Sequence, residues 1–319
     1  MLKLCIRRFL LLLLQLSILS FVVFFIVHAV HIIMWVTDSG ISMAEAQVYL
    51  PSLRDLTYAY WNWLVGIITR GDFGWSWRLQ MPAMEAIGVR LFNMIRLSLV
   101  ALLLVYGIGI PLGIISGRHS GTWIDRTIQM ITQIGASFPS FTVALLLILY
   151  LGFHLGWFPT RGSLPPGMAR EAGFIPYHMG RLRHVMMPAI SLAVIQLITP
   201  MKYLRSGIID TEQQDFVILA RAKGAREAHV FKKHIFKNSL ISLVGSFPIQ
   251  ISIILTGTII IESIFSFPGL GEMFLTAFFG MDTDLLKSIV LVFGSLILLG
   301  AFISDVLLMA IDPRVKIDE

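Results

Sequence analysis

The sequence has little charge. Asp, Glu, Lys and Arg make up only 14% of the 319 residues, whereas about a quarter of the residues in a typical soluble domain are charged. Hydrophobic residues make up 56%, and the mean hydropathy is +0.80. Because so few charged side chains cannot cover the surface of a water-soluble chain, the composition predicts an integral membrane protein.

Cysteine is nearly absent, and so are the motifs of several enzyme classes. Cys5 is the single cysteine, which excludes a disulfide framework within the chain. No Gly is followed by Lys, so the phosphate-binding loop G-x-x-x-x-G-K-[ST] is missing. No His is followed by Glu, so the zinc motif H-E-x-x-H is missing too. The 22 Phe and 7 Trp exclude a disordered chain.

Long stretches without charge indicate how the chain crosses the membrane. A transmembrane helix needs about 20 mostly apolar residues. Six charge-free stretches reach or approach that length, the last of them only if Asp305 is tolerated near its end: 9–37, 97–117, 127–160, 184–201, 238–261 and 288–304. None shows the alternation typical of an outer-membrane barrel. We therefore expect an all-α integral membrane protein with six transmembrane helices.

The distribution of Lys and Arg predicts the orientation. With the N-terminus in the cytoplasm, the inner segments 1–8, 118–126, 202–237 and 312–319 carry 15 Lys and Arg in about 60 residues. The outer segments, near 38–96, 161–183 and 262–287, carry 10 in about 108. Both termini are therefore expected in the cytoplasm. We expect the first stretch to stay as an anchor, because it is about twice as long as a signal-peptide core and no A-x-A-like site follows it.

The parts of the chain differ in their expected roles. Residues 1–90 are predicted to form an anchor helix and a long outer loop, 91–312 a core of five spans, and 313–319 a cytoplasmic tail. Within the outer loop, the aromatic run 58–63 favours a helix at the membrane interface. Gly71-Asp-Phe-Gly74 is typical of a tight turn.

The cytoplasmic segment 210–238 predicts two helices joined by a glycine turn. Thr211 is expected to cap a helix with Glu212 and Asp215 in its first turn. Gly224 fits the residue just after that helix. A second helix is expected to start at Arg226 or Glu227 and to run into the fifth span.

This segment resembles the cytoplasmic loop of permease subunits of bacterial ABC importers. That loop is often written E-A-A-x₃-G-x₉-I-x-L-P. With Gly224 as its glycine, the chain has Ile218 at the Glu position, Leu219 at the first Ala position, His234 at the Ile position and Lys237 at the Pro position. These departures suit the branch that imports oligopeptides, dipeptides and nickel. Its loops resemble the stretches found here: Asp215-Phe-Val217, Ala220-Arg-Ala-Lys-Gly224, His234 and Asn238-Ser-Leu240.

Other stretches extend the resemblance to roughly residues 70–315. They are Gly71-Asp-Phe-Gly-Trp-Ser76, Phe265-Ser-Phe-Pro-Gly-Leu-Gly271, Ile303-Ser-Asp-Val306 and Ile311-Asp-Pro-Arg-Val315. The family's usual P-G-D-P after the first span is missing, and so is its G-L-D-x-P. The outer loop around 37–60 is therefore where this chain is expected to differ from the family.

The resemblance implies a type I ABC importer permease in the bacterial cytoplasmic membrane. It implies a second permease subunit, two cytoplasmic ATPases that bind ATP and Mg, and an extracytoplasmic lipoprotein that delivers substrate. The chain itself is expected to bind no cofactor, no metal and no nucleic acid. A peptide is the expected substrate, with nickel or a metal chelate as the alternative. The implied coupling loop is 211–228, in which Arg221, Lys223 and Arg226 could meet ATPase carboxylates. The residues assigned to coupling are Asp215, Phe216, Ala220, Arg221, Ala222, Lys223, Gly224, His234 and Asn238.

Some polar or kinking residues within the spans have two interpretations. Glu262 could face the mouth of the pathway, and Asp305 could help a proton or cation pathway, but snorkelling of Asp305 or its pairing with a cytoplasmic-side Lys or Arg is favoured. Pro139 could be a gate hinge or a packing kink. His28 and His31 share a helix face, where interhelical packing is favoured over a metal site. A membrane enzyme or an ion-driven transporter would need catalytic sets or internal repeats, which the sequence does not show.

Overall fold

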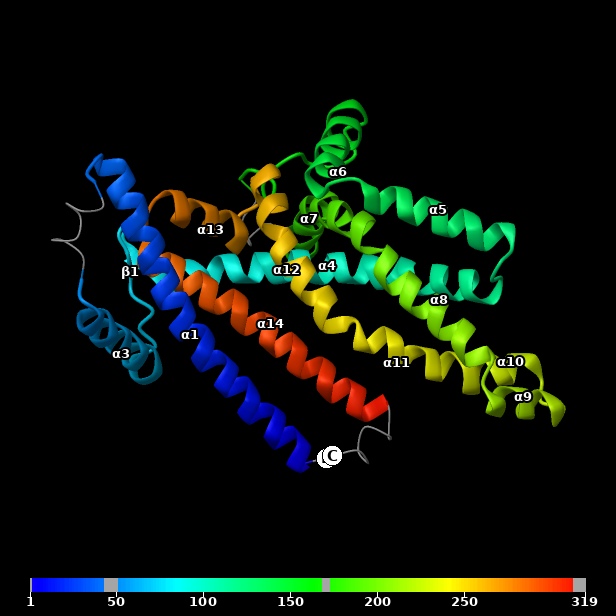
Figure 1. The fold of residues 1–319 in the computed structure, drawn as a ribbon. Coiled ribbons are helices and arrows are strands. Elements are labelled where there is room, and N and C mark those ends of the chain that lie inside the picture. Colours follow the sequence, from blue (N-terminus) through cyan, green and yellow to red (C-terminus); the bar gives the residue numbers. More distant parts are fainter. Residues whose placement is uncertain (1, 43–50, 168–172, 312–319) are drawn as a thin grey trace. The chain divides into compact units, whose positions relative to one another are not determined.

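The computed structural model describes residues 2–42, 51–167 and 173–311, and these are mostly helical (Figure 1). The predicted tail 313–319, with Arg314 and Lys316, lies outside the described residues, as does most of the 311–315 motif. The contacts divide the chain into two units. One comprises Met94–Pro268 and Gly300–Glu319, and the other comprises Leu2–Asn93 and Gly269–Leu299.

The helices of the first unit follow one another with short breaks. They are α4 (Ala83–Arg118, which begins in the other unit), α5 (Trp123–Ser137), α6 (Ser140–Leu147), the π-helical η1 (Ile148–His154), α7 (Phe174–Gln196), α8 (Ile198–Glu212), α9 (Asp215–Ala222), α10 (Glu227–Val230), the π-helical η3 (Phe231–Phe236), α11 (Lys237–Gly245) and α12 (Phe247–Ile264). The second unit holds α1 (Leu2–Ser39), α3 (Leu53–Arg70), the antiparallel pair β1 (Trp75–Ser76) and β2 (Met81–Pro82), α13 (Leu270–Phe279) and most of α14 (Thr283–Ile311).

Four described helices are apolar and long enough to cross a membrane unbroken: α1, α4, α12 and α14. Two bent pairs bring the number to six if each is one span. α5 meets α6 and η1 at 94°, and α7 meets α8 at 41°. The predicted all-α architecture is confirmed, and six spans are reached only with these bent pairs.

Three of the predicted spans are interrupted rather than continuous, among them 184–201, which bends at Leu197 between α7 and α8. The stretch 127–160 breaks before Pro139, where Phe138 is extended with ψ 138°, because a proline disfavours helical geometry in the residue before it. The stretch 238–261 breaks at Ser246, and Pro248 then lies in the first turn of α12. Proline is tolerated there because the first turn has no N–H partner in the helix.

A stripe of glycines on α4 lets α8 approach closely. Gly109, Gly113 and Gly117 recur every four residues and face Pro200, Leu204 and Ile208, which have the same spacing on α8. A Cβ at Gly113 would lie 3.0 Å from the Met201 carbonyl oxygen and 3.1 Å from Leu204 Cβ. Small residues permit such close helix contacts in membranes, where packing drives association.

We expect Gly113→Leu to destabilise the first unit by about 3 kcal/mol, because the extra carbons overfill a tight contact. Gly107→Leu is the matched control on the same helix, because a Cβ there meets nothing within 4 Å. The control should be neutral or slightly stabilising, since leucine favours helices more than glycine does. Thermal unfolding midpoints of the purified subunit measure both, and equal shifts would contradict this packing.

The second unit is organised around α1 and α3. Ser52 and Asp55 form a reciprocal capping box at the start of α3, and Gly71 ends the helix with φ 64°. Tyr60 is buried and its hydroxyl lies 3.0 Å from Ser20 Oγ of α1. The predicted helix around 58–63 is therefore confirmed, and it packs on Phe24 of α1 through Tyr60 and Trp63, whereas its place at the membrane interface stays a prediction.

The Gly71–Ser76 stretch forms the predicted turn and is attached to the start of α14. Asp72 Oδ1 accepts a 2.9 Å hydrogen bond from Gly74 N, and Ser76 Oγ donates to Asp282 Oδ2 at 2.6 Å. Gly74 has φ 95°, and a Cβ there would lie 2.9 Å from Asp284 Cγ. The second glycine of this motif is therefore required both by backbone conformation and by space.

Candidate functional site

The cytoplasmic loop, residues 210–238, lies at one end of the first unit (Figure 1). Its first helix begins later than predicted. Thr211 is buried within the last turn of α8 and does not cap α9; Gln214 holds the capping position instead, with ψ 143°. α8 continues because Thr211 packs inward, so the residues that break the helix are Gln213 and Gln214. Asp215 remains in the first turn of α9, where a carboxylate is favourable.

Gly224 ends α9 as predicted. Its φ is +77°, its N–H donates to Arg221 O at 2.9 Å, and Ala225 N donates to Ala220 O at 3.2 Å. These two bonds form a Schellman motif, which satisfies carbonyls that the helix end would leave exposed. A Cβ at Gly224 meets nothing within 4 Å, so the glycine is needed for its conformation and not for space.

Charged side chains fasten the two halves of the loop together. Arg221 Nη2 lies 2.7 Å from Glu227 Oε1 and 3.4 Å from Glu212 Oε1. The hydrogen bond from Arg221 holds the pKa of Glu227 below its usual value. Sequence reasoning assigned Arg221 to ATPase carboxylates, whereas the structure shows it bridging α8, α9 and α10.

An apolar cluster holds the loop against the rest of the unit. It consists of Leu204 and Ile208 from α8, Val217 from α9, Val230 from α10 and Ile235 from η3, all fully buried. The Arg118 guanidinium at the end of α4 lies 4.7 Å from the centre of the Phe231 ring. The loop is therefore in direct contact with α8 and with the end of α4.

The two alanines of the motif have different environments. Ala220 packs against the apolar cluster, whereas Ala222 is exposed. The outer face of α9 also carries Phe216, Ile218 and Leu219, which are 39%, 55% and 54% exposed. Sequence reasoning placed Phe216 and Leu219 on the spacing of this helix but counted Ile218 only as a departure from the motif. Their periodicity around the buried Val217 was the signal that they face outward.

The remaining loop residues lie on the second half. Lys223 is exposed at the C-cap of α9. The His234 ring is half-buried, with its centre 6.3 Å from that of Phe216 and 6.2 Å from that of His229. Asn238 Nδ2 donates to His234 O at 2.6 Å, one turn back along the helix. These contacts order the approach of η3 to α11.

Sequence reasoning missed a buried ion pair behind the loop. Asp125 of α5 is 1% exposed and receives two 2.8 Å hydrogen bonds from Arg205 of α8. It also accepts from Ser116 Oγ at 2.5 Å, Gly121 N at 2.9 Å and Gln129 Nε2 at 2.8 Å. This network joins the end of α4 to α5 and α8. No spacing in the sequence links Asp125 to a partner 80 residues away.

The residues singled out within the spans lie apart from the loop. Pro139 marks the bend between α5 and α6. Glu262 is fully buried in α12, Asp305 is half-buried in α14, and their pathway roles stay predictions. The His28 ring stacks on Phe24 at 4.2 Å. Among the described residues, no group of three or more His, Cys, Asp or Glu side chains gathers as a metal site would require.

Comparison with known proteins identifies the class. Residues 109–317 match the family described as binding-protein-dependent transport system inner membrane component, and the chain belongs to this family. Among its relatives, the oligopeptide transport system permease protein AppB of Bacillus subtilis (strain 168) is 34% identical over 88% of this chain and 87% of the relative. The dipeptide transport system permease protein DppB of Lactococcus lactis subsp. cremoris (strain MG1363) is 30% identical over 79% and 78%.

A solved structure has the same fold. The inward-facing methionine ABC transporter MetNI aligns with 72% of this chain and 97% of its own, with a TM-score of 0.57 at 16% identity. The chain is thus an ABC transporter permease subunit of the inner membrane, and a transport component rather than an enzyme. Membership of this family excludes the two alternatives considered from the sequence, an ion-driven transporter and a membrane enzyme.

Proposed function

We propose that this subunit forms half of the translocation pathway of an ATP-driven peptide importer. The names of the relatives favour a peptide over nickel or a metal chelate. A second, homologous permease would form the other half, and an extracytoplasmic binding lipoprotein would deliver the peptide. Two cytoplasmic ATPases would bind ATP and Mg, while this chain binds no cofactor. Glu262 and Asp305 are proposed to contribute to the pathway, and Pro139 to its gate.

The cytoplasmic loop is the proposed contact with an ATPase. The observation that supports this proposal is the packing of α9. Its outer side exposes apolar side chains, while its inner side packs against α8. Exposed apolar side chains on a polar cytoplasmic loop are typical of a protein–protein contact. Asp215, Lys223 and Arg226 surround this face as its polar rim.

The same packing supplies a route for coupling. A push on α9 reaches α8 through Val217 and Ile208, and α8 meets α4 along the glycine stripe. The Asp125–Arg205 pair carries the same displacement to α5. Close-packed contacts transmit displacement because interiors have low compressibility.

Cysteine labelling tests both sidedness and docking. In a chain whose Cys5 is changed to Ser, Ala222→Cys should be unreactive to an impermeant maleimide in intact cells and should react in inside-out vesicles. Added ATPase subunits should lower its labelling rate at least about tenfold, because Ala222 lies on the exposed face of α9. Exposed Arg161, changed to Cys, is the outer control and should react in intact cells, with no protection by ATPase.

Labelling of Ala222→Cys in intact cells would overturn the orientation. Correct sidedness without protection by the ATPase would instead overturn the assignment of α9 as the contact. The two outcomes separate the topology from the coupling role.

A further inference from the structure

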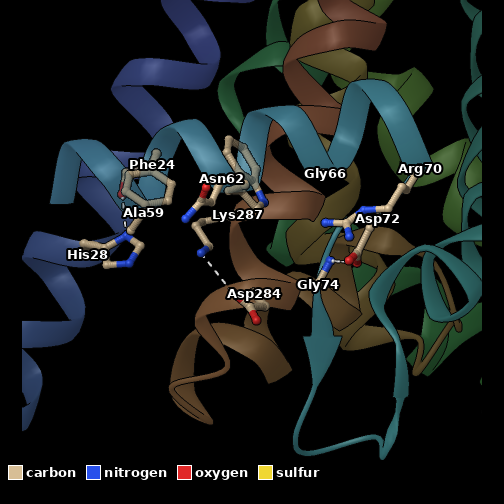
Figure 2. A pocket seen from close by; sticks show the side chains of 11 residues that line it. Phe24, His28, Ala59, Asn62, Gly66, Arg70, Asp72, Gly74, Asp284 and Lys287 are labelled. Atoms are coloured by element: carbon tan, nitrogen blue, oxygen red, sulfur yellow. Dashed lines mark hydrogen bonds and ion pairs between the residues drawn. The ribbon is translucent and has the colours of Figure 1, made fainter. Parts of the chain in front are cut away.

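The second unit contains a polar cavity of about 230 Å³ that the transport function does not explain (Figure 2). It lies between α1, α3, the turn after α3 and the first turns of α14. Its volume is below the 300–1,000 Å³ typical of drug-sized ligands, so it suits a small polar group. The charged or titratable residues that line it are His28, Arg70, Asp72, Asp284 and Lys287.

Lys287 is the fixed centre of this cavity. Its side chain is only 5% exposed, and Nζ lies 2.9 Å from Asp284 Oδ1. The ammonium also lies 4.9 Å from the centre of the Phe24 ring and 5.7 Å from that of Trp63. A lysine is almost never buried unless it is paired, and aromatic faces stabilise a cation further. Lys287 is therefore a buried, paired lysine held by its neighbours, and not a solvated lysine on the surface.

Charges of both signs line the cavity as two neighbouring pairs, Lys287 with Asp284 and Arg70 with Asp72. Figure 2 shows Asp284 and Lys287 between His28 on one side and Arg70 with Asp72 on the other. The two carboxylates balance the two permanent cations. A cavity that presents balanced charges of both signs complements a zwitterion better than it complements a simple anion.

The depth of the cavity follows from helix lengths. On α1, His28 comes 20 residues after Arg8, which corresponds to about 30 Å along a helix. On α14, Lys287 precedes Asp305 by 18 residues, or about 27 Å. Arg8 and Asp305 are at the cytoplasmic ends of their charge-free stretches, and the hydrocarbon core is about 30 Å thick. Both helices therefore place the cavity at the headgroup level of the outer leaflet.

The helix that borders the cavity has an apolar outer side. Tyr58, Trp61, Val65 and Ile68 follow helical spacing on α3 and are 71%, 60%, 50% and 73% exposed. The opposite side of α3 is held on α1 by Tyr60. Aromatic and aliphatic side chains in this arrangement are typical of a helix that lies in the membrane interface.

We propose that this cavity binds the headgroup of a zwitterionic phospholipid with a primary ammonium, from the outer leaflet. Arg70 holds the lipid phosphate, and Asp72 with Asp284 holds its ammonium. The apolar side of α3 contacts the acyl chains of the surrounding leaflet. A bound lipid links α1, α3 and α14 at the membrane surface.

Native mass spectrometry of the purified full transporter tests the proposal. After delipidation, the complex is titrated with dioleoylphosphatidylethanolamine or dioleoylphosphatidylglycerol. One equivalent of the first lipid should bind at least about fivefold more tightly than the second. Arg70→Gln and Asp72→Asn should each remove most of this preference. Both residues lie at an exposed edge, so the variants should fold.

Arg54→Gln is the matched control, because Arg54 is an exposed arginine of the same helix outside the cavity. It should bind the lipid like the unmodified protein. Equal losses in Arg70→Gln and Arg54→Gln, or equal affinity for both lipids, would overturn the proposal in favour of a general interfacial attraction. Equal competition by soluble glycerophosphoethanolamine would overturn the lipid as source. If Arg70→Gln weakened the affinity for the binding protein but did not change lipid binding, the cavity would be a protein contact, and the lipid proposal would be overturned as well. Lipid binding is measured independently of transport, so a negative result in this experiment would not contradict the proposed transport function.

Discussion

Asp125→Ala is expected to destabilise the subunit by on the order of 3 kcal/mol, since it breaks a buried ion pair. The substitution leaves the Arg205 guanidinium, 23% exposed as a side chain, without its carboxylate. It also removes the acceptor for Ser116, Gly121 and Gln129. The cost arises because charges and donors withdrawn from water remain behind without compensation. The thermal unfolding midpoint of the purified transporter in detergent measures the loss.

Asp210→Ala is the matched control for this prediction. Asp210 is an exposed carboxylate of α8, and its side chain accepts only a 3.3 Å hydrogen bond from Ser206 among the bonds described. Its loss should change the stability by less than about 0.5 kcal/mol. The double variant Asp125→Leu with Arg205→Met should recover much of the loss, because apolar residues can replace a buried pair. Equal shifts for Asp125→Ala and Asp210→Ala would contradict the network.

Gly224→Val is expected to reduce transport about tenfold or more at normal expression. Its φ of +77° is unfavourable for a residue with a Cβ, and more so for a β-branched one. A cost of about 1.4 kcal/mol in the docked conformation corresponds to tenfold in affinity. Uptake by cells and ATPase co-purification measure transport and docking separately.

Gly224→Asn separates conformation from size at the same position. Asparagine tolerates the left-handed region, and the space around a Cβ at Gly224 is open. The Asn variant should therefore keep most of the transport that the Val variant loses. Normal uptake with Gly224→Val, or equal loss in both variants, would contradict the role assigned to this turn.

Much of the loop could be predicted from local sequence. Gly224 predicted the end of α9 because a left-handed residue after a helix is a local requirement. The start of α9 could not be predicted in the same way. Thr211 has the side chain of a good cap, but it is buried in the tertiary packing of α8, and Gln214 holds the cap. The packing of Thr211 within α8 thus overrides the intrinsic preference of threonine for the capping position.

The breaks within the spans show the same limit. A charge-free stretch measures only whether a segment can enter the bilayer. It does not show that Pro139 bends one stretch by 94° or that Ser246 divides another. The bend angle depends on which neighbouring helices satisfy the freed backbone groups.

By itself, the sequence determined the membrane class and the family and predicted the orientation of the charged segments, because low charge, Lys and Arg placement and the Ala220–Gly224 motif are local properties. Only the tertiary structure decided which polar residues meet. Arg205 reaches Asp125, and Lys287 lies against the rings of Phe24 and Trp63, because helix packing brings distant residues to the same depth. Pairing in a low-dielectric interior depends on distance in space, which spacing along the chain does not record.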